Sequence, residues 1–269
     1  MSNKICEEII DTAKTLYGDN DIKNIDEVPP CSIAFEELSD ENIIDYNENN
    51  FNWKKFWTYA KLKFPLHSVH GSKKYDCDYK IFESEQYRCH SQIGNLIKKM
   101  LKNKPTCLEI GFGFGGAAHY LSCLGFRYYG IDYVNSIINP DLKNKFNGYD
   151  TSFIEIQKNG IPYELNNIQF DLVYSTNVFQ HITEKQRNEY YKQVYKQLKN
   201  GGIFYFDLFT NNFKPKVNAT VFFGVNTTIP SEDETFKKLK GIGFNNIRLI
   251  NRYRLDDVDN YLTLITCEK

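Results

Sequence analysis

The sequence predicts an α/β fold in three layers, in which helices cover both faces of a seven-stranded, mostly parallel sheet. Two observations support this prediction. From residue 106 onward, short apolar runs typical of buried parallel strands alternate with segments of helical periodicity. The last two strand-like runs, 246–250 and 261–266, have no helix between them. We therefore expect them to pair as a hairpin, which makes the C-terminal strand antiparallel.

Seven short apolar runs are the expected strands. The first, 106–110, stops at glycines, as a buried parallel strand does. In chain order, the expected strands span residues 106–110, 127–132, 152–156, 170–175, 202–208, 246–250 and 261–266.

Four segments have the apolar periodicity of helices. The third is the clearest, because Thr183 and Gln186 form a capping box at its start and Gly201 is placed to end it. Ser231 and Glu234 form a second capping box, which opens the fourth helix. The expected helices span residues 84–101, 115–124, 183–198 and 231–239.

The chain is expected to divide near residue 84. Residues 84–269 contain the strands and helices described above, whereas residues 1–83 are predicted to be a helical or irregular N-terminal segment that acts as a substrate lid. An aromatic cluster in this segment either packs the segment onto the core or closes over a ligand pocket. The cluster comprises Phe51, Trp53, Phe56, Trp57, Tyr59 and Phe64.

The composition excludes several classes of protein. Lys and Arg number 33 against 34 Asp and Glu, so no global field attracts nucleic acid or an anionic membrane. No stretch approaches the roughly 18 apolar residues of a membrane span, and the N-terminus lacks the apolar core of a secretory signal. Seven scattered cysteines without a Cys-x-x-Cys pair argue against disulfides and structural zinc. We expect a cytoplasmic monomer or homodimer with no metal, nucleic-acid or membrane partner.

A glycine-rich loop lies between the first strand and the second helix. Glycines let the backbone turn sharply and approach a ligand, and the helix that follows offers free amide groups. Asp132 ends the next strand, where a carboxylate can accept hydrogen bonds from both hydroxyls of a ribose. Gly111, Gly113 and Gly116 match the dinucleotide-binding pattern Gly-x-Gly-x-x-Gly, so a nicotinamide dinucleotide is one candidate ligand.

Glu109 favours a different ligand. Together with Gly111, Gly113 and Gly115 it forms Glu-x-Gly-x-Gly-x-Gly, which resembles the first motif of the class I, Rossmann-like S-adenosylmethionine-dependent methyltransferases. S-Adenosylmethionine carries an ammonium group near this loop, which a carboxylate attracts. A dinucleotide places a pyrophosphate there, which a carboxylate repels.

Three further segments resemble this family. Residues 170–181 are similar to its fourth motif, residues 198–203 to the entry of its fifth strand, and residues 232–266 to its last helix and reversed strand. The resemblance covers residues 84–269. Residues 133–150 depart from it, because they are expected to be irregular where the family has a regular helix.

The resemblance implies a binding site for S-adenosylmethionine, with S-adenosylhomocysteine as the product. Glu109 and the glycines would hold the methionine part, Asp132 the ribose and Tyr133 the adenine. Gln157 falls where the family often has an acidic residue that contacts the adenine, and its amide can still form that hydrogen bond. Arg88 either binds the carboxylate of the donor or is a solvated helix charge. The expected cofactor-binding residues are Arg88, Glu109, Gly111, Gly113, Gly115, Asp132, Tyr133, Gln157, Thr176 and Asn177.

Two residues at or just beyond the ends of expected strands are candidates for catalysis. A hydroxyl acceptor loses its proton as the methyl group is transferred, so it usually needs a base. His181 follows the fourth strand, where an open α/β sheet presents residues to its ligand, although a histidine there also caps or packs against the next helix. Asp207 near the end of the fifth strand is the second candidate.

The acceptor is expected to be a small molecule. A basic group of residues favours an anionic acceptor, although it also fits ordinary solvated charge. These residues are His67, His70, Lys73, Lys74, Lys214 and Lys216. A general similarity to methyltransferases of bacterial surface-glycan and capsule pathways implies O-methylation of a sugar or phosphate-bearing precursor in polysaccharide biosynthesis. Two alternatives remain: an NAD-dependent oxidoreductase and a cofactor-binding protein without turnover.

Overall fold

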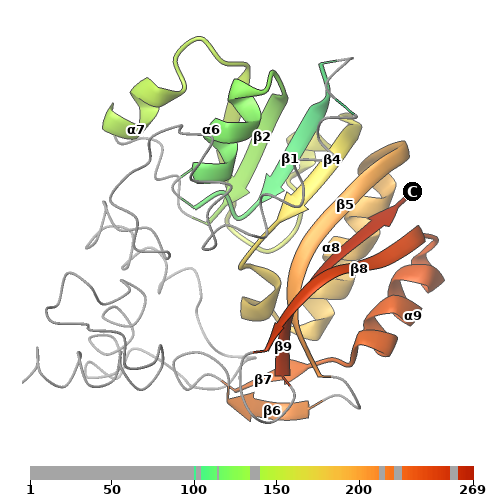
Figure 1. The fold of residues 1–269 in the computed structure, drawn as a ribbon. Coiled ribbons are helices and arrows are strands. Elements are labelled where there is room, and N and C mark those ends of the chain that lie inside the picture. The colour runs from blue at the N-terminus through green and yellow to red at the C-terminus, as the bar shows by residue number, and fades with distance from the viewer. Residues whose placement is uncertain are drawn as a thin grey trace, which may run out of the picture. The chain divides into compact units, whose positions relative to one another are not determined.

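The computed structural model describes Met100 and residues 104–113, 115–133, 140–211, 216–220, 226–254 and 260–269 (Figure 1). The expected lid in residues 1–83 and Arg88 lie outside this part of the chain. The same holds for the expected helix at 84–101, of which only Met100 is described, in a helical conformation.

The predicted seven-stranded sheet is confirmed, with the strand order β3-β2-β1-β4-β5-β9-β8. β1 is parallel to β2 and β4, and the parallel pairing continues from β2 to β3 and from β4 to β5. β9 is antiparallel to both β5 and β8, so the reversed C-terminal strand is also confirmed (Figure 1). The strands are β1 (Thr106–Ile110), β2 (Arg127–Asp132), β3 (Thr151–Glu155), β4 (Phe170–Ser175), β5 (Leu198–Asn211), β8 (Asn245–Arg254) and β9 (Asn260–Glu268).

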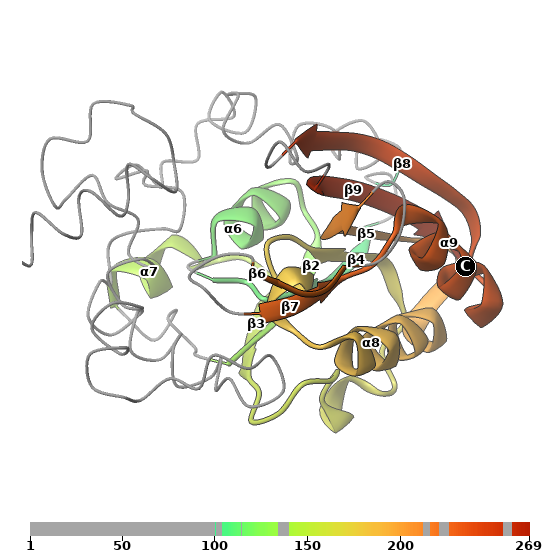
Figure 2. The ribbon, with the colours of Figure 1, turned by 90° about the horizontal axis from the view of Figure 1, so that it is seen from below.

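Helices lie on both faces of this sheet, which confirms the three layers. α6 (Gly116–Cys123) covers one face, and α8 (Glu184–Gln197) and α9 (Glu232–Ile242) cover the other (Figures 1 and 2). Side chains of a strand point alternately to the two faces. Leu108 therefore packs with the α8 side, whereas its neighbour Cys107 packs with the α6 side.

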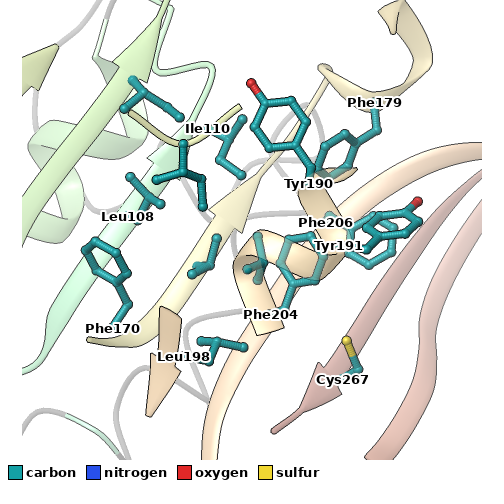
Figure 3. Packing of buried hydrophobic residues seen from close by; sticks show 14 of the residues in the cluster. Leu108, Ile110, Phe170, Phe179, Tyr190, Tyr191, Leu198, Phe204, Phe206 and Cys267 are labelled. Atoms are coloured by element: carbon teal, nitrogen blue, oxygen red, sulfur yellow. The ribbon is translucent and has the colours of Figure 1, made fainter. Parts of the chain in front are cut away.

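The core on the α8 side is rich in aromatic rings (Figure 3). Phe204 and Phe206 of β5 stack with ring centroids 4.5 Å apart, and Tyr191 of α8 packs against both. Complete burial of one such side chain contributes about 1.5–3 kcal/mol. This core fixes α8 against the sheet, and thereby the position of the segment that connects β4 to α8.

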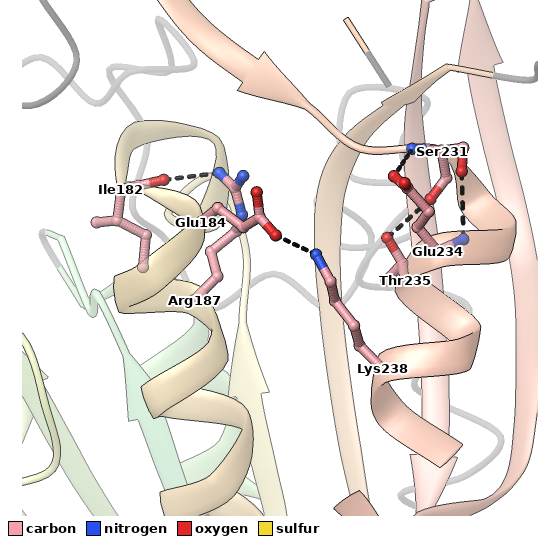
Figure 4. A network of polar contacts seen from close by, with 7 residues as sticks. All are labelled: Ile182, Glu184, Arg187, Ser231, Glu234, Thr235 and Lys238. Carbon is pink, nitrogen blue, oxygen red and sulfur yellow. Dashed lines mark hydrogen bonds and ion pairs between the residues drawn. The ribbon is translucent and has the colours of Figure 1, made fainter. Parts of the chain in front are cut away.

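Both predicted capping boxes are confirmed. Thr183 caps α8 and exchanges hydrogen bonds with Gln186, and Ser231 caps α9 in the same way with Glu234. Figure 4 shows the second box.

An ion pair joins the two helices on this face. Lys238 of α9 donates a hydrogen bond to Glu184 in the first turn of α8 (Figure 4). This bond lowers the pKa of Glu184. Both side chains are partly exposed, so we expect a contribution of at most about 1 kcal/mol to stability.

The predicted end of α8 at Gly201 is wrong. α8 ends at Gln197, and Leu198 already pairs with Phe170 as the first residue of β5. The pairing then shifts, so that Ile203 lies opposite Leu172 and β5 has extra residues between these two pairs. Gly201 is one of these extra residues and has a φ of 77°. The left-handed conformation of this glycine thus forms a bulge in β5 instead of ending the helix.

Two other segments contain regular structure that was not among the expected elements. Residues 133–150, expected to be irregular, contain the short helix α7 (Pro140–Lys145), whose first residue is a proline, as is common at that position. The insertion after β5 contains a two-stranded antiparallel sheet of β6 (Lys216–Thr220) and β7 (Asn226–Ile229). Among the described residues, no helix has both the length and the apolar character needed to cross a membrane.

Candidate active site

The glycine loop connects the carboxyl end of β1 to α6. Gly111, Gly113 and Gly115 all have positive φ angles, of 79°, 56° and 81°, a region that residues with a side chain rarely occupy. The Gly111 N–H donates a hydrogen bond to the carbonyl of Ile131 at 2.7 Å, and the Gly115 N–H donates to that of Phe112 at 2.8 Å. These bonds fix the loop to β2 and close a tight turn before the helix.

Asp132 lies beside this loop. Its Oδ2 accepts a hydrogen bond from the Gly113 N–H at 2.8 Å, so the end of β2 and the glycine loop form one site. A Cβ built on Gly113 would have no atom of the described residues within 4 Å, so these residues leave open space next to the loop. Tyr133 follows and is half-buried, and burial together with the charge of Asp132 raises its pKa to about 12.

Glu109 is buried on the α6 side of β1, with 4% of its surface exposed. Its Oε2 accepts a hydrogen bond from the hydroxyl of Tyr128 on β2. Burial raises the pKa of Glu109 to about 8, the Tyr128 hydrogen bond acts in the opposite direction, and the charge of Asp132 raises the pKa further. The carboxyl is therefore mostly protonated at neutral pH.

The turn after β4 packs against the glycine loop. A Cβ built on Gly111 would lie 2.2 Å from Cγ2 of Val178, so this valine occupies the space that a side chain at position 111 would need. The hydroxyl of Ser175 donates a hydrogen bond to the carbonyl of Ile110 at 3.1 Å. Asn177, between Ser175 and Val178, has a φ of 57°. The residues after β4 thus lie close to the expected donor site.

Asp207 holds this turn from the adjacent strand. Phe206 pairs with Ser175, the last residue of β4, so Asp207 lies one position beyond the end of β4. Its Oδ1 accepts a hydrogen bond from the Asn177 N–H at 2.7 Å. Asp207 is 1% exposed, and its Oδ2 has no hydrogen-bond partner among the described residues. Burial raises its pKa to about 7, although the bond from Asn177 acts in the opposite direction.

His181 ends the 3₁₀ helix η6 (Phe179–His181), directly after this turn. Its side chain is half-buried, and burial lowers its pKa to about 3, so the imidazole is neutral at physiological pH. The buried Arg187 of α8 donates hydrogen bonds to the carbonyls of Phe179 at 3.2 Å and Ile182 at 2.6 Å, the second of which is drawn in Figure 4. The N-cap residue of α8 is Thr183.

The other expected cofactor residues are spread more widely. Thr176 is half-buried and donates a hydrogen bond to the hydroxyl of Tyr174 at 3.3 Å. Gln157 is exposed beyond the end of β3, and its amide donates to Glu155 at 3.4 Å. The side chains of the six basic residues predicted to attract an anionic acceptor lie outside the described part of the chain.

Sequence reasoning missed three residues that shape this site: Tyr128, Val178 and Arg187. Each acts through a contact that depends on tertiary structure. Tyr128 reaches Glu109 across two strands, Val178 fills the space above Gly111, and Arg187 binds carbonyls of η6. No local pattern marks them, although an arginine on the apolar side of a predicted helix is a signal that we left unused.

Comparison with known proteins agrees with this arrangement. A family model described as a methyltransferase domain matches residues 108–204. Phosphoethanolamine N-methyltransferase 2 of Caenorhabditis elegans is 29% identical over 110 residues, which cover 40% of this chain and 25% of that protein. The matched region thus spans about a quarter of the length of this curated relative.

Solved structures share the fold. The 1,6-didemethyltoxoflavin-N1-methyltransferase of Burkholderia thailandensis, with bound S-adenosylhomocysteine, has a TM-score of 0.52 at 16% identity, covering 71% of this chain and 82% of that one. The N-terminal domain of EvdMO1, in the presence of S-adenosylhomocysteine and D-fucose, has a TM-score of 0.52 at 11% identity, covering 67% and 81%. The [4+2]-cyclase SpnF has a TM-score of 0.51 at 12% identity, covering 69% and 83%.

At these identities the structural likeness shows the fold alone, and SpnF illustrates that proteins of this fold differ in the reaction for which they are named. The methyltransferase model, in contrast, matches the segment that carries the glycine loop, Asp132 and the turn after β4. Residues 108–204 thus match a methyltransferase domain, which agrees with the resemblance of the glycine loop to the class I S-adenosylmethionine-dependent methyltransferases.

Proposed function

We propose that this protein transfers the methyl group of S-adenosylmethionine to a hydroxyl group of a small molecule, namely a sugar or a phosphate-bearing precursor. The observation that carries the proposal is the joined site at the carboxyl ends of β1 and β2. There the Gly113 N–H binds the carboxylate of Asp132, and the turn after β4 packs on Gly111. In open α/β sheets, ligands bind at this end of the strands.

The residues present fit the methyl donor. Open space among the described residues next to Gly113 leaves room for a ligand at the loop, and we expect Asp132 to accept hydrogen bonds from ribose hydroxyls. Glu109 supplies a carboxyl near the loop for a cationic amino group, and Tyr133 offers a half-buried ring for the adenine. The donor supplies a methyl group on a sulfonium, which is already activated for displacement.

The chain therefore has to align the acceptor and remove its proton. We assign the second task to His181, because this residue directly follows the turn that packs on the glycine loop. Its lowered pKa keeps the imidazole neutral at physiological pH, which is the form that a general base needs, and also makes it a weaker base than a free imidazole.

Asp207 has a different role in this proposal. With 1% of its surface exposed, it acts on the acceptor indirectly, by holding the Asn177 N–H and thereby the turn that leads to His181. The ionised carboxylate is the stronger hydrogen-bond acceptor. We therefore expect the turn to be held most firmly above the pKa of Asp207, which is about 7.

The relatives support the choice of acceptor class. The C. elegans relative is named for a phosphate-bearing acceptor and for methylation on nitrogen, so it supports the phosphate and not the hydroxyl. The EvdMO1 domain was crystallised in the presence of a sugar. Acceptors of these two classes fit the role that we propose for this chain, in the biosynthesis of a glycan or another surface polysaccharide. An amine acceptor that reacts from its protonated form must also lose a proton, so it would need His181 as a base in the same way.

One experiment tests the proposal and names the acceptor. The protein is incubated with methyl-labelled S-adenosylmethionine and a metabolite extract, and the products are analysed by mass spectrometry. We expect S-adenosylhomocysteine together with a labelled small molecule whose methyl group is on oxygen. A labelled amine would overturn the hydroxyl assignment. Absence of both products would overturn the methyl-transfer activity and favour a cofactor-binding protein without turnover.

A further inference from the structure

Glu109 and Tyr128 form a buried pair on neighbouring strands. Glu109 lies opposite Gly130 in the β1–β2 pairing, two residues from Tyr128, and both side chains point to the α6 face. They are 4% and 0% exposed, and the Tyr128 hydroxyl donates a hydrogen bond to Oε2 of Glu109. The hydroxyl thus orients the carboxyl from within the core.

Gly130 makes this contact sterically possible. A Cβ built on Gly130 would lie 2.9 Å from the Tyr128 hydroxyl oxygen and 2.8 Å from Cδ1 of Phe112. Both distances are shorter than real Cβ contacts. The missing side chain leaves room for the hydroxyl beside Glu109, and for Phe112 of the glycine loop. The pair and the loop are therefore packed as one unit.

The carboxyl of this unit holds a proton before a ligand binds. Burial raises the pKa of Glu109 to about 8, against the effect of the Tyr128 hydrogen bond, and Asp132 of β2 raises it further. Cys107 on the same strand interacts with Glu109, and its own pKa is raised by burial, by Glu109 and by Asp171 of β4. These neighbours are neutral or acidic, so none of them replaces a cationic ligand as the partner of the carboxylate.

We propose that Tyr128 is a positioning residue for the donor-binding carboxyl, and that Glu109 releases its proton to solvent when the cationic amino group of the methyl donor binds next to it. The inference rests on the proposed function, because that function supplies the cation. In this step the O–H bond of the Glu109 carboxyl breaks, its electron pair remains on the carboxylate, and the proton passes to the buffer. The Tyr128 hydroxyl keeps its proton and stabilises the new charge.

The affinity for the donor or its product should then depend on pH. One proton released per ligand means that affinity rises about tenfold per pH unit below the pKa of the free carboxyl. The amino group of the ligand has a reference pKa of about 8, so the range from about pH 6 to 7.5 keeps it cationic. 5′-Methylthioadenosine lacks the amino acid part, and its affinity should be independent of pH in this range.

Titration calorimetry of the full-length protein tests the inference without relying on activity. S-Adenosylhomocysteine and 5′-methylthioadenosine are each titrated at several pH values in two buffers of different ionisation enthalpy. The difference in the heat of binding between the two buffers gives the number of protons released. We expect about one proton for S-adenosylhomocysteine and none for 5′-methylthioadenosine. Glu109→Gln should abolish the release while its amide oxygen still accepts the Tyr128 hydrogen bond.

Tyr128→Phe separates positioning from packing. Loss of a hydrogen bond to the ionised carboxylate should weaken S-adenosylhomocysteine binding at pH 7 by about 10- to 100-fold and move its pH dependence to higher pH. Binding of 5′-methylthioadenosine should not change. Tyr191→Phe is the matched control, because the Tyr191 hydroxyl is buried without a hydrogen-bond partner among the described residues. This control should bind both ligands as the unmodified protein does.

Three results would overturn the inference: binding of S-adenosylhomocysteine without proton release, release that persists in Glu109→Gln, or an equal loss of affinity for both ligands in Tyr128→Phe. A protein that binds S-adenosylhomocysteine at no pH would instead contradict the proposed function. The two failures are therefore distinguishable in the same titrations.

Discussion

The backbone N–H of Asn177 donates a 2.7 Å hydrogen bond to the buried carboxyl of Asp207, across 30 positions of the sequence. This bond connects β5 to a turn in which Asn177 has a positive φ angle. The next residue, Val178, fills the space above Gly111, and His181 follows within one short helix. A carboxyl in the core thus sets the position of the segment that adjoins both the glycine loop and the candidate base.

The pH dependence of catalysis should follow Asp207. Ionisation near pH 7 strengthens its bond to the Asn177 N–H, so kcat should rise with pH through about 7 in the unmodified protein. Asp207→Asn retains an acceptor oxygen but cannot ionise, and its kcat should lack this rise. Asp207→Ala removes the bond and should lower kcat by about 10- to 100-fold. A rise near pH 7 that persists in Asp207→Asn would assign it to another group.

Replacement of His181 tests the general base. His181→Ala should lower kcat by about 10²–10⁴, whereas the affinity for S-adenosylhomocysteine should hardly change. Because burial lowers the pKa of His181 to about 3, kcat of the unmodified protein should show no imidazole step near the reference pKa of about 6.5. A folded His181→Ala variant that keeps more than about a tenth of kcat would remove His181 from the catalytic residues. A lower melting temperature with unchanged kcat would mark a purely structural histidine.

Asp132 is expected to contribute to donor binding. Asp132→Ala removes the predicted ribose contacts and the partner of the Gly113 N–H, and should weaken S-adenosylhomocysteine binding by about 1.5–3 kcal/mol. Asp150→Ala is the matched control, since the exposed side chain of this aspartate pairs with the exposed side chain of Arg127. Titration calorimetry of both variants measures the difference. Equal affinities of Asp132→Ala and the unmodified protein would exclude the ribose role.

The contact between the two loops predicts a compensating pair of substitutions. Gly111→Ala places a methyl group 2.2 Å from Val178 Cγ2 and should displace the glycine loop, with a loss of thermal stability and of affinity for S-adenosylhomocysteine. Val178→Ala in the same chain should restore part of both. Gly113→Ala is the comparison: it has a positive φ but open space, so only a backbone penalty of about 1 kcal/mol is expected. Purely additive effects in the double variant would contradict the steric explanation.

The parts of the fold that the sequence predicted correctly are those with local signals. The capping boxes at Thr183 and Ser231 require only residues three positions apart, and the glycine loop with Glu109 and Asp132 follows a motif. The closing hairpin followed from the missing helix between its strands. Each of these features depends on neighbours in the chain, so its pattern is visible without a structure.

The contacts that build the site depend on register and packing. Asp207 was a candidate by its place near a strand end, but its bond to Asn177 follows from the pairing of β4 with β5. The bond between Tyr128 and Glu109 likewise needs the β1–β2 register and the space above Gly130. The sequence predicted a helix end at Gly201 where the structure has a bulge in β5, because a glycine with positive φ occurs both at helix ends and in bulges.

The central claim is that this glycine loop binds S-adenosylmethionine and not a dinucleotide. The most direct test titrates the unmodified protein with S-adenosylhomocysteine and, separately, with NAD in a calorimeter. Glu109 next to the loop becomes the anionic partner of the amino group of the first ligand once it releases its proton, whereas the pyrophosphate of the second offers no cation to this carboxyl. We expect S-adenosylhomocysteine to bind with micromolar or higher affinity and NAD to give no detectable heat of binding. Tighter binding of NAD than of S-adenosylhomocysteine would contradict the account.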